Sequence, residues 1–136
     1  MKKISKMLIL ILIMQTSLAF ANQEILQGFE IEAKKEDVKF LKFSIKEGEK
    51  LFRSERMHSS GEKISCMTCH TSDPKNSGLT RANKVIDPLA PIINKERFTD
   101  KTKVEKWFKR NCKDVLEREC TIQEKGNFVI YMMSIK

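Results

Sequence analysis

Two cysteines and a histidine stand together in the stretch CMTCH, residues 66–70. In the C-x-x-C-H spacing, the thiols of Cys66 and Cys69 can both add across the vinyl groups of one haem, and His70 follows as an axial ligand of the iron. A zinc site would need paired clusters of four Cys or His ligands, and a thioredoxin-like dithiol would need a β-α-β context. The sequence around the motif offers neither, so it predicts one covalently bound haem c. The second ring nitrogen of His70 needs an acceptor, for which we expect a backbone carbonyl near Pro88.

The region that usually supplies the ligand on the opposite side of the iron contains neither of the two usual ligand types. A downstream methionine is the common sixth ligand in small c-type cytochromes, yet the chain has no methionine and no histidine between Thr71 and Cys120. The remaining candidates precede the motif, lie inside it, or fall on a helix whose apolar face is expected to be used in packing: Met57, His58, Met67, Met132 and Met133.

Asn111 offers a different donor on a predicted helix. It occupies a slot in an apolar stripe formed by Val104, Trp107, Phe108 and Val115, so we expect its amide to be buried. A buried amide needs a polar partner, because leaving it unpaired costs about 1 to 3 kcal/mol. A hydrogen bond to a backbone carbonyl or a haem propionate is favoured somewhat over iron ligation on the spacing alone, and both interpretations stay open.

Two further cysteines lie close to Asn111. Cys112 follows it directly, and Cys120 is near in sequence. In an oxidising compartment a disulfide between them would hold the residue beside Asn111 in place, with two free thiols as the alternative.

The first 21 residues have the form of a secretory signal peptide. A basic start, MKKISK, precedes the apolar run MLILILIM, and Ala19-x-Ala21 predicts cleavage after Ala21. The run is shorter than the roughly 20 apolar residues of a spanning helix, although an uncleaved anchor is the alternative. We therefore expect export to the periplasm, an oxidising compartment, and one domain of 115 residues at 22–136.

The charge of the chain is mildly basic. The formal net charge of +8 includes three lysines of the predicted signal peptide, which leaves +5 for residues 22–136. Lysines and glutamates are interspersed, as in KKEDVK, so the pattern indicates a solvated surface and no nucleic-acid site. A basic rim that docks an acidic redox partner is the alternative.

Apolar residues at helical spacing predict a helical domain without an alternating strand pattern. A short first helix covers about residues 22–33, with Ile25, Leu26 and Phe29 on one side. A second covers about residues 36–55, with an apolar stripe at Val38, Leu41, Ile45, Gly48 and Phe52. Because glycine destabilises a helix, Gly48 on the buried face predicts a close crossing with another helix.

A long loop and two more helices complete the expected fold. Residues 71–98 contain all three prolines and predict a loop that wraps the haem edge. A third helix follows Thr99 or Asp100 as its N-cap, and a fourth begins at Thr121, which forms a capping box with Glu124. Gly126 is expected to permit packing of this last helix against the helix of Gly48, with ordinary core packing as the alternative. The last helix has an apolar face at Phe128, Tyr131, Met132 and Ile135.

Three segments together closely resemble one known family. The run RFTDKTKVEKWFKRNCKDVLERECTIQEKG, with SCMTCH and IDPLAP, resembles the oxygen-binding monohaem cytochrome c family of the sphaeroides haem protein type, and the resemblance extends from about Ile25 to Ile135. It implies an all-α, class I cytochrome c-like fold around one haem, with an extra N-terminal helix. It also implies that Asn111 ligates the oxidised iron, that Cys112 pairs with Cys120, and that the partners are a dihaem cytochrome c and a membrane cytochrome b. The lysine-rich first half departs from the family pattern and leaves the docking surface open.

The sequence and the resemblance together predict an exported monohaem cytochrome c. We expect it to transfer electrons and, when its iron is ferrous, to bind a diatomic ligand such as O₂, NO or CO. An amide oxygen is a weak, hard donor that suits ferric iron, so Asn111 would act as a redox-gated ligand. A simple six-coordinate electron carrier is the alternative. We expect no enzyme, since nothing in the sequence supplies a clear proton donor, although turnover of a bound oxygen or nitrogen species at an open ferrous iron is a third interpretation. Further candidates for contact with the haem propionates, with surface or core packing as the alternative, are Trp107, Arg81, Lys84 and Arg97.

Overall fold

The computed structural model describes residues 21–136. The signal peptide predicted at 1–21 thus falls, apart from its last residue, outside the described residues, and both it and the domain boundary stay predictions. Residues 21–36 are helical. The following elements are α2 (Ile45–Arg53), β1 (Arg56–Met57), β2 (Lys63–Ile64), α3 (Met67–His70), β3 (Gly78–Leu79), β4 (Val85–Ile86), α4 (Lys101–Leu116) and α5 (Ile122–Ser134).

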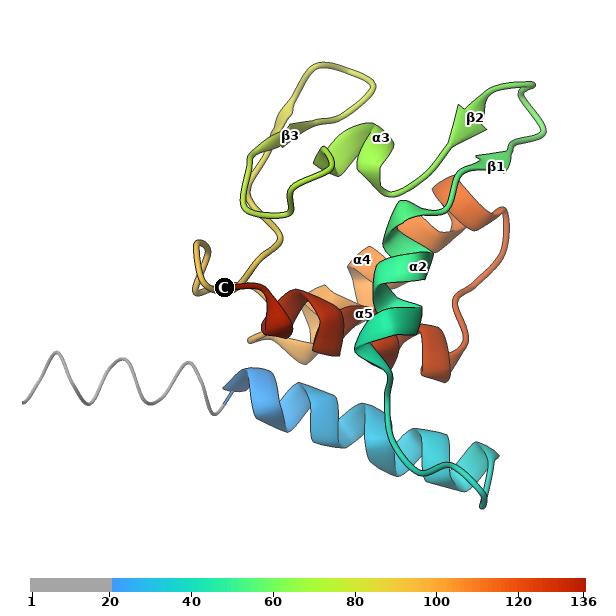
Figure 1. The fold of residues 1–136 in the computed structure, drawn as a ribbon, viewed down its shortest axis with the longest axis vertical. Helices are drawn as coiled ribbons and strands as arrows, with labels where there is room; N and C mark the ends of the chain where they lie inside the picture. The colour runs from blue at the N-terminus through green and yellow to red at the C-terminus, as the bar shows by residue number, and fades with distance from the viewer. Residues whose placement is uncertain (1–20) are drawn as a thin grey trace, which may run out of the picture.

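Helices dominate the fold, as Figure 1 shows. The strands form two short antiparallel hairpins, with Arg56 opposite Ile64 in the first and Gly78 opposite Ile86 in the second. Neither hairpin was predicted, because strands of two residues are too short to show alternation. Within residues 21–136, no helix has both the length and the apolar character needed to cross a membrane.

A close crossing of α2 and α5 forms the centre of the molecule. A Cβ atom at Gly48 would collide with the backbone carbonyl of Asn127 and lie 2.7 Å from the Cβ atom of Tyr131. The crossing predicted at Gly48 is therefore confirmed. Gly126 has a different neighbour from the one expected, because it faces the ring of Phe43 rather than α2.

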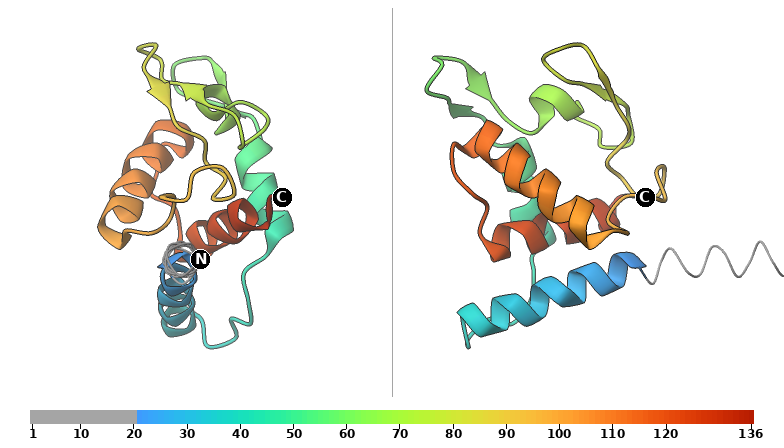
Figure 2. Two further views of the ribbon diagram at one scale, coloured as in Figure 1. Left: turned by 90° about the vertical axis from the view of Figure 1, so that its left-hand side faces the viewer. Right: turned by 180° about the vertical axis from the view of Figure 1, so that it is seen from behind.

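The core lies between the first helix, α2, α4 and α5. Figure 2 shows the first helix below α4 and α5, on the side of the molecule away from α3. Its apolar residues Ile25, Leu26 and Phe29 are buried, which confirms the predicted face. Phe108 makes edge-on contacts with both Phe29 and Phe128, with ring centroids 6.1 and 5.7 Å apart. This aromatic cluster joins the first helix to α4 and α5, which lie far from it in sequence.

The second helix begins later than predicted. Residues 37–44 form a connecting loop, and Val38 and Leu41 are 91% and 89% exposed instead of buried. Ser44 caps α2, since its Oγ accepts a hydrogen bond from the backbone N–H of Glu47. The Ser44 N–H donates in turn to Asn127 Oδ1 at 2.8 Å, which fixes the start of α2 against α5. A serine cap secured by a tertiary contact thus overrides the apolar spacing that precedes it.

Helices α4 and α5 begin at the N-cap residues predicted from the sequence. Asp100 Oδ1 accepts a hydrogen bond from the Lys103 N–H at the start of α4. At the start of α5, the Thr121 and Glu124 side chains each accept from the backbone N–H of the other, which confirms the capping box.

Candidate haem-binding site

The short helix α3 and its N-cap residue Cys66 together hold all three residues of the predicted haem motif. Cys66 caps α3 and accepts hydrogen bonds through its carbonyl from the N–H groups of Cys69 and His70, at 3.4 and 3.1 Å. Ser65 stabilises this turn by donating its N–H to Thr68 Oγ1 at 2.9 Å. Both motif cysteines are free thiols and half-buried. A single helical turn therefore presents the two thiols and the imidazole that covalent attachment requires.

A glycine lets the second hairpin lie directly on α3. A Cβ atom at Gly78 would collide with the Cys69 carbonyl oxygen and lie 3.0 Å from the Cα atom of His70. No side chain fits there without moving the backbone of the motif. The sequence analysis missed this role, because a single glycine in a loop region carries no sign of what packs against it.

Arg97 organises the IDPLAP segment beside His70. Its Nε donates to the Pro88 carbonyl at 2.8 Å and its Nη2 to the Asp87 carbonyl at 2.6 Å. Asn94 Nδ2 also donates to the Pro88 carbonyl, at 3.4 Å. The carbonyls of Asp87 and Pro88 are thus occupied by Arg97 and Asn94, because a guanidinium reaches two neighbouring carbonyls at once. The acceptor predicted for His70 near Pro88 stays a prediction.

The surroundings of the motif determine the protonation states of His70 and Cys66. Burial lowers the pKa of His70 to about 4, and the positive charge of Arg97 acts in the same direction. The imidazole is therefore neutral at pH 7, which is the form that ligates a metal. Burial raises the pKa of Cys66 to about 11, against a smaller opposing effect of Arg56, so this side chain is a thiol at neutral pH.

The apolar stripe of α4 divides into two rows. Val104, Phe108 and Cys112 are buried in the core, whereas Trp107 is 46% exposed and Asn111 is exposed. The prediction that Asn111 is buried in the protein is therefore wrong. The reason is the helical rotation of about 100° per residue. Each row repeats every four residues, and only the row that includes Cys112 faces the core.

The structure brings some predicted residues together and keeps others apart. Cys112 and Cys120 form the predicted disulfide, with their Cα atoms 5.6 Å apart. Asn111 stands on α4 and His70 on α3, and these two helices make no extensive contact with each other. A group that contacts both residues must reach from one helix to the other.

Several of the residues considered as alternative iron ligands lie in the core or in the first hairpin. Met132 is fully buried in the core, whereas Met57 is exposed on β1. His58 lies in the turn of the first hairpin, where its Nδ1 is 2.9 Å from Ser60 Oγ and its Nε2 is 3.6 Å from Glu117 Oε1.

The residues present fit a covalently attached haem. The donor set is two free thiols and one neutral imidazole on a single turn, and residues 21–136 hold no cluster of three or more His, Cys, Asp or Glu side chains for a directly chelated ion. In addition, Arg56 Nη1 is buried and has no hydrogen-bond partner within the described chain, and Arg56 is close enough to Cys66 to lower its pKa. An unpaired guanidinium N–H suits a carboxylate, and a haem carries two propionates. Arg56 was not predicted, because nothing in the sequence distinguishes it from the other basic residues.

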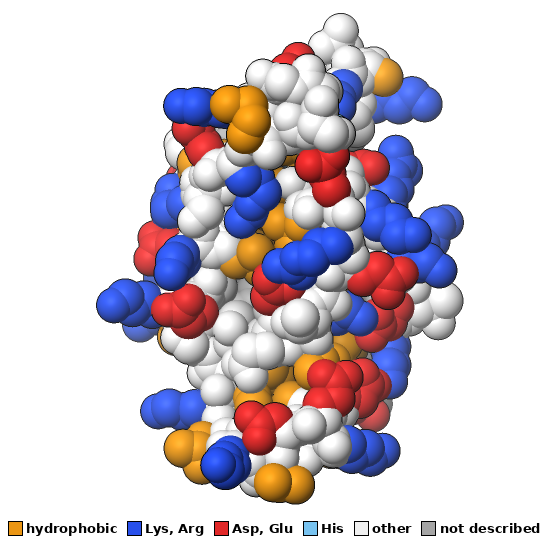
Figure 3. Space-filling view, turned by 90° about the vertical axis from the view of Figure 1, so that its right-hand side faces the viewer, with side chains coloured by type: hydrophobic (Ala, Val, Ile, Leu, Met, Phe, Trp, Pro, Cys, Tyr) orange, Lys and Arg blue, Asp and Glu red, His pale blue; other side chains and the backbone are white. Residues whose placement is uncertain are grey.

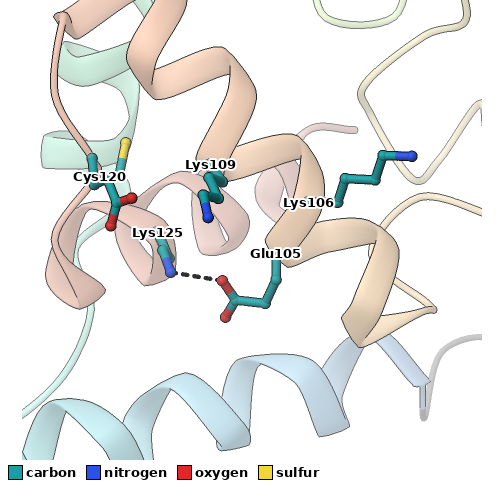
Figure 4. A pocket seen from close by; sticks show the side chains of 6 residues that line it. Glu105, Lys106, Lys109, Cys120 and Lys125 are labelled. Atoms are coloured by element: carbon teal, nitrogen blue, oxygen red, sulfur yellow. Dashed lines mark hydrogen bonds and ion pairs between the residues drawn. The ribbon is translucent and has the colours of Figure 1, made fainter.

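A shallow surface pocket lies elsewhere, beside the disulfide. Figure 4 shows its lining, in which Lys125 Nζ pairs with Glu105 Oε2 at 2.7 Å. Its other lining residues are Lys106, Lys109, Glu119 and Cys120. None of the predicted haem-attachment residues lines this pocket.

Comparisons with known proteins agree with this site. A family model described as a domain of unknown function, DUF1924, matches residues 38–132. The cytochrome c-type protein SHP of Cereibacter sphaeroides is 42% identical over 85 residues, which cover 62% of this chain and 66% of that protein. Cytochrome c'' of Methylophilus methylotrophus is 40% identical over 92 residues, which cover 67% of this chain and 64% of the relative. These two alignments thus span slightly less than two thirds of each relative.

Solved structures are similar over more of their length. Oxidised cytochrome c'' from Methylophilus methylotrophus has a TM-score of 0.78 at 32% identity, and the match covers 86% of this chain and 96% of that chain. Oxidised SHP, described as an oxygen-binding cytochrome c, has a TM-score of 0.71 at 35% identity, with 82% and 94% covered. The solution structure of cytochrome c'', described as giving insight into haem-ligand detachment, has a TM-score of 0.74 at 33% identity, with 84% and 93% covered.

Proposed function

The chain belongs to the DUF1924 family and to the group of monohaem c-type cytochromes that includes SHP and cytochrome c'', and from this premise we propose that it is an electron carrier with a redox-gated site for a diatomic ligand. The family resemblance and the helical cytochrome c fold predicted from the sequence are confirmed, and the chain carries one covalently bound haem c with its iron. When bound, the haem supplies one-electron redox chemistry and, in its ferrous state, affinity for O₂, NO and CO.

The proposal rests on the row of α4 side chains that includes Trp107 and Asn111. Trp107 and Asn111 lie outside the protein core, so their side chains are available to a bound group. The amide oxygen of Asn111 is a neutral, hard donor, which suits ferric iron and holds ferrous iron weakly. Asn111 would therefore hold the iron of the oxidised protein and release the reduced iron, and His70 would hold the iron in both states.

The surroundings of Asn111 support its role as a gate. The Cys112–Cys120 disulfide ties the residue after Asn111 to the start of α5, which limits how far the amide can move. The half-exposed indole of Trp107, one turn earlier, is an apolar neighbour that helps to exclude water. One similar structure is described as an oxygen-binding cytochrome c and another as informative on haem-ligand detachment, which is the behaviour proposed for this chain.

The proposed cellular location and redox partners rest on the sequence. The predicted signal peptide supports a periplasmic protein, and the family resemblance supports electron exchange with a dihaem cytochrome c and a membrane cytochrome b. Within this proposal the chain binds and releases its ligand unchanged, without enzymatic turnover.

Absorption spectra of the holoprotein test the proposal. We expect a high-spin ferrous spectrum that shifts on addition of CO, and a ferric spectrum that changes in Asn111→Ala. Gln27→Ala is the matched control, because Gln27 is an exposed amide side chain on the first helix, on the side of the molecule away from α3, and it is expected to leave both spectra unchanged. A low-spin ferrous spectrum that ignores CO would establish the simple six-coordinate carrier instead, and an unchanged ferric spectrum in Asn111→Ala would remove Asn111 as the ligand.

A further inference from the structure

The loop of residues 37–44 presents two aliphatic side chains almost wholly to water. Val38 and Leu41 are the most exposed of the large apolar residues of the described chain, at 91% and 89%. Local hydrogen bonds order the backbone that carries them. The Asp37 N–H donates to the Ala33 carbonyl at 2.9 Å, and Asp37 Oδ1 accepts from the Lys39 N–H at 2.8 Å. These apolar tips are therefore held outward by a defined turn.

Two phenylalanines anchor the same loop from the inside. The rings of Phe40 and Phe43 lie 4.9 Å apart, and Phe43 is buried with its ring against Gly126 of α5. Because Phe40 and Phe43 occupy the inward positions, Val38 and Leu41 cannot turn into the core without displacing them. The outward direction of the aliphatic pair is thus a consequence of packing.

Lysines surround the exposed pair. The segment 34–46 contains five exposed lysines, against two acidic residues, Glu36 and Asp37. None of the five forms an ion pair with any residue in the described range: Lys34, Lys35, Lys39, Lys42 and Lys46. Figure 3 shows apolar side chains between Lys and Arg side chains at the lower end of the molecule, where this loop lies. An apolar tip with a basic rim complements a surface that is apolar inside and negatively charged outside.

We propose that loop 37–44 docks the protein on an anionic lipid bilayer. Val38 and Leu41 would enter the interface between headgroups and acyl chains, while the lysines interact with anionic headgroups. The position of the loop distinguishes this surface from a site for an electron-transfer partner. The loop and α3 lie at opposite ends of the molecule, as Figure 1 shows. A redox partner must approach the haem, whereas a bilayer bound at the loop leaves the end that carries His70 free.

Vesicle sedimentation with the purified holoprotein tests this proposal. The wild type is expected to bind vesicles of phosphatidylglycerol and phosphatidylcholine, to bind pure phosphatidylcholine much more weakly, and to dissociate as salt is raised. Lys39→Glu with Lys42→Glu is expected to weaken binding by about 25-fold or more, because each lysine near an anionic surface contributes about fivefold. Val38→Ser with Leu41→Ser is expected to weaken it by about 100-fold or more, because two aliphatic side chains lose their burial.

A matched charge control isolates the loop from net charge. Lys63→Glu with Lys95→Glu makes the same change in net charge at two exposed positions outside the loop, and it is expected to bind vesicles nearly as the wild type does. An equal loss in this control would show that binding depends on net charge alone and would overturn the proposal. Failure of the wild type to bind anionic vesicles would overturn it too, as would loop variants that bind vesicles normally but exchange electrons slowly with an acidic partner protein. These outcomes are independent of the spectra that test Asn111.

Discussion

Gly48→Ala tests the close crossing of α2 and α5. The added methyl group would collide with the Asn127 carbonyl oxygen and lie 2.6 Å from its carbonyl carbon, both of which are backbone atoms of α5. Overpacking costs about 1 to 3 kcal/mol, and the upper end applies because a helix backbone cannot rotate aside as a side chain can. Alanine returns about 1 kcal/mol of helix propensity. The variant is therefore expected to lose about 2 kcal/mol of unfolding free energy.

Gly28→Ala is the matched control for this substitution. Gly28 lies within the first helix, and no atom comes within 4 Å of a Cβ placed there. The same change should stabilise the protein by about 0.5 to 1 kcal/mol, because only the helix propensity term applies. Denaturant titration followed by far-ultraviolet circular dichroism measures both variants, provided that the m-values agree with the wild type. If Gly48→Ala were as stable as Gly28→Ala, the crossing would not be as close as described, and the reasoning would fail.

Two further predictions concern the C-terminal half of the chain. Replacing Cys112 and Cys120 together by serine removes a disulfide with a sequence separation of 8. The variant is expected to lose about 2.5 kcal/mol of unfolding free energy in the same titration. A loss near zero would mean that the bridge constrains neither the unfolded chain nor the fold. Hydrogen bonds from Arg118 lower the pKa of Glu124, so the stabilising effect of this carboxylate is present above its unfolded pKa and disappears as the pH falls through the folded value. The stability advantage of the wild type over Glu124→Gln is accordingly expected to be full at pH 7 and to shrink below about pH 4.3, and an advantage that did not change with pH would refute the ion-pair explanation.

Features that depend on neighbours in sequence could be predicted. The haem motif needs only the order of Cys66, Cys69 and His70, which one helical turn converts into a fixed arrangement. The capping box of Thr121 and Glu124 is equally local, since its hydrogen bonds close within three residues. The helical spacing of the first, third and fourth helices likewise carried enough information to place them.

Features that depend on what packs against a residue could not be predicted. The stripe that contains Trp107 and Asn111 divides because α5 and the first helix cover only one row of α4, and spacing along one helix does not reveal which row is covered. Loop 37–44 has the apolar spacing of a helix, yet the bond from Ser44 to Asn127 starts α2 later and turns Val38 to water. The sequence by itself determined the chemistry of haem attachment, because covalent spacing is local. The tertiary structure alone decided which apolar and polar side chains remain available to a haem or a membrane, because burial is a property of contacts between segments far apart in the chain.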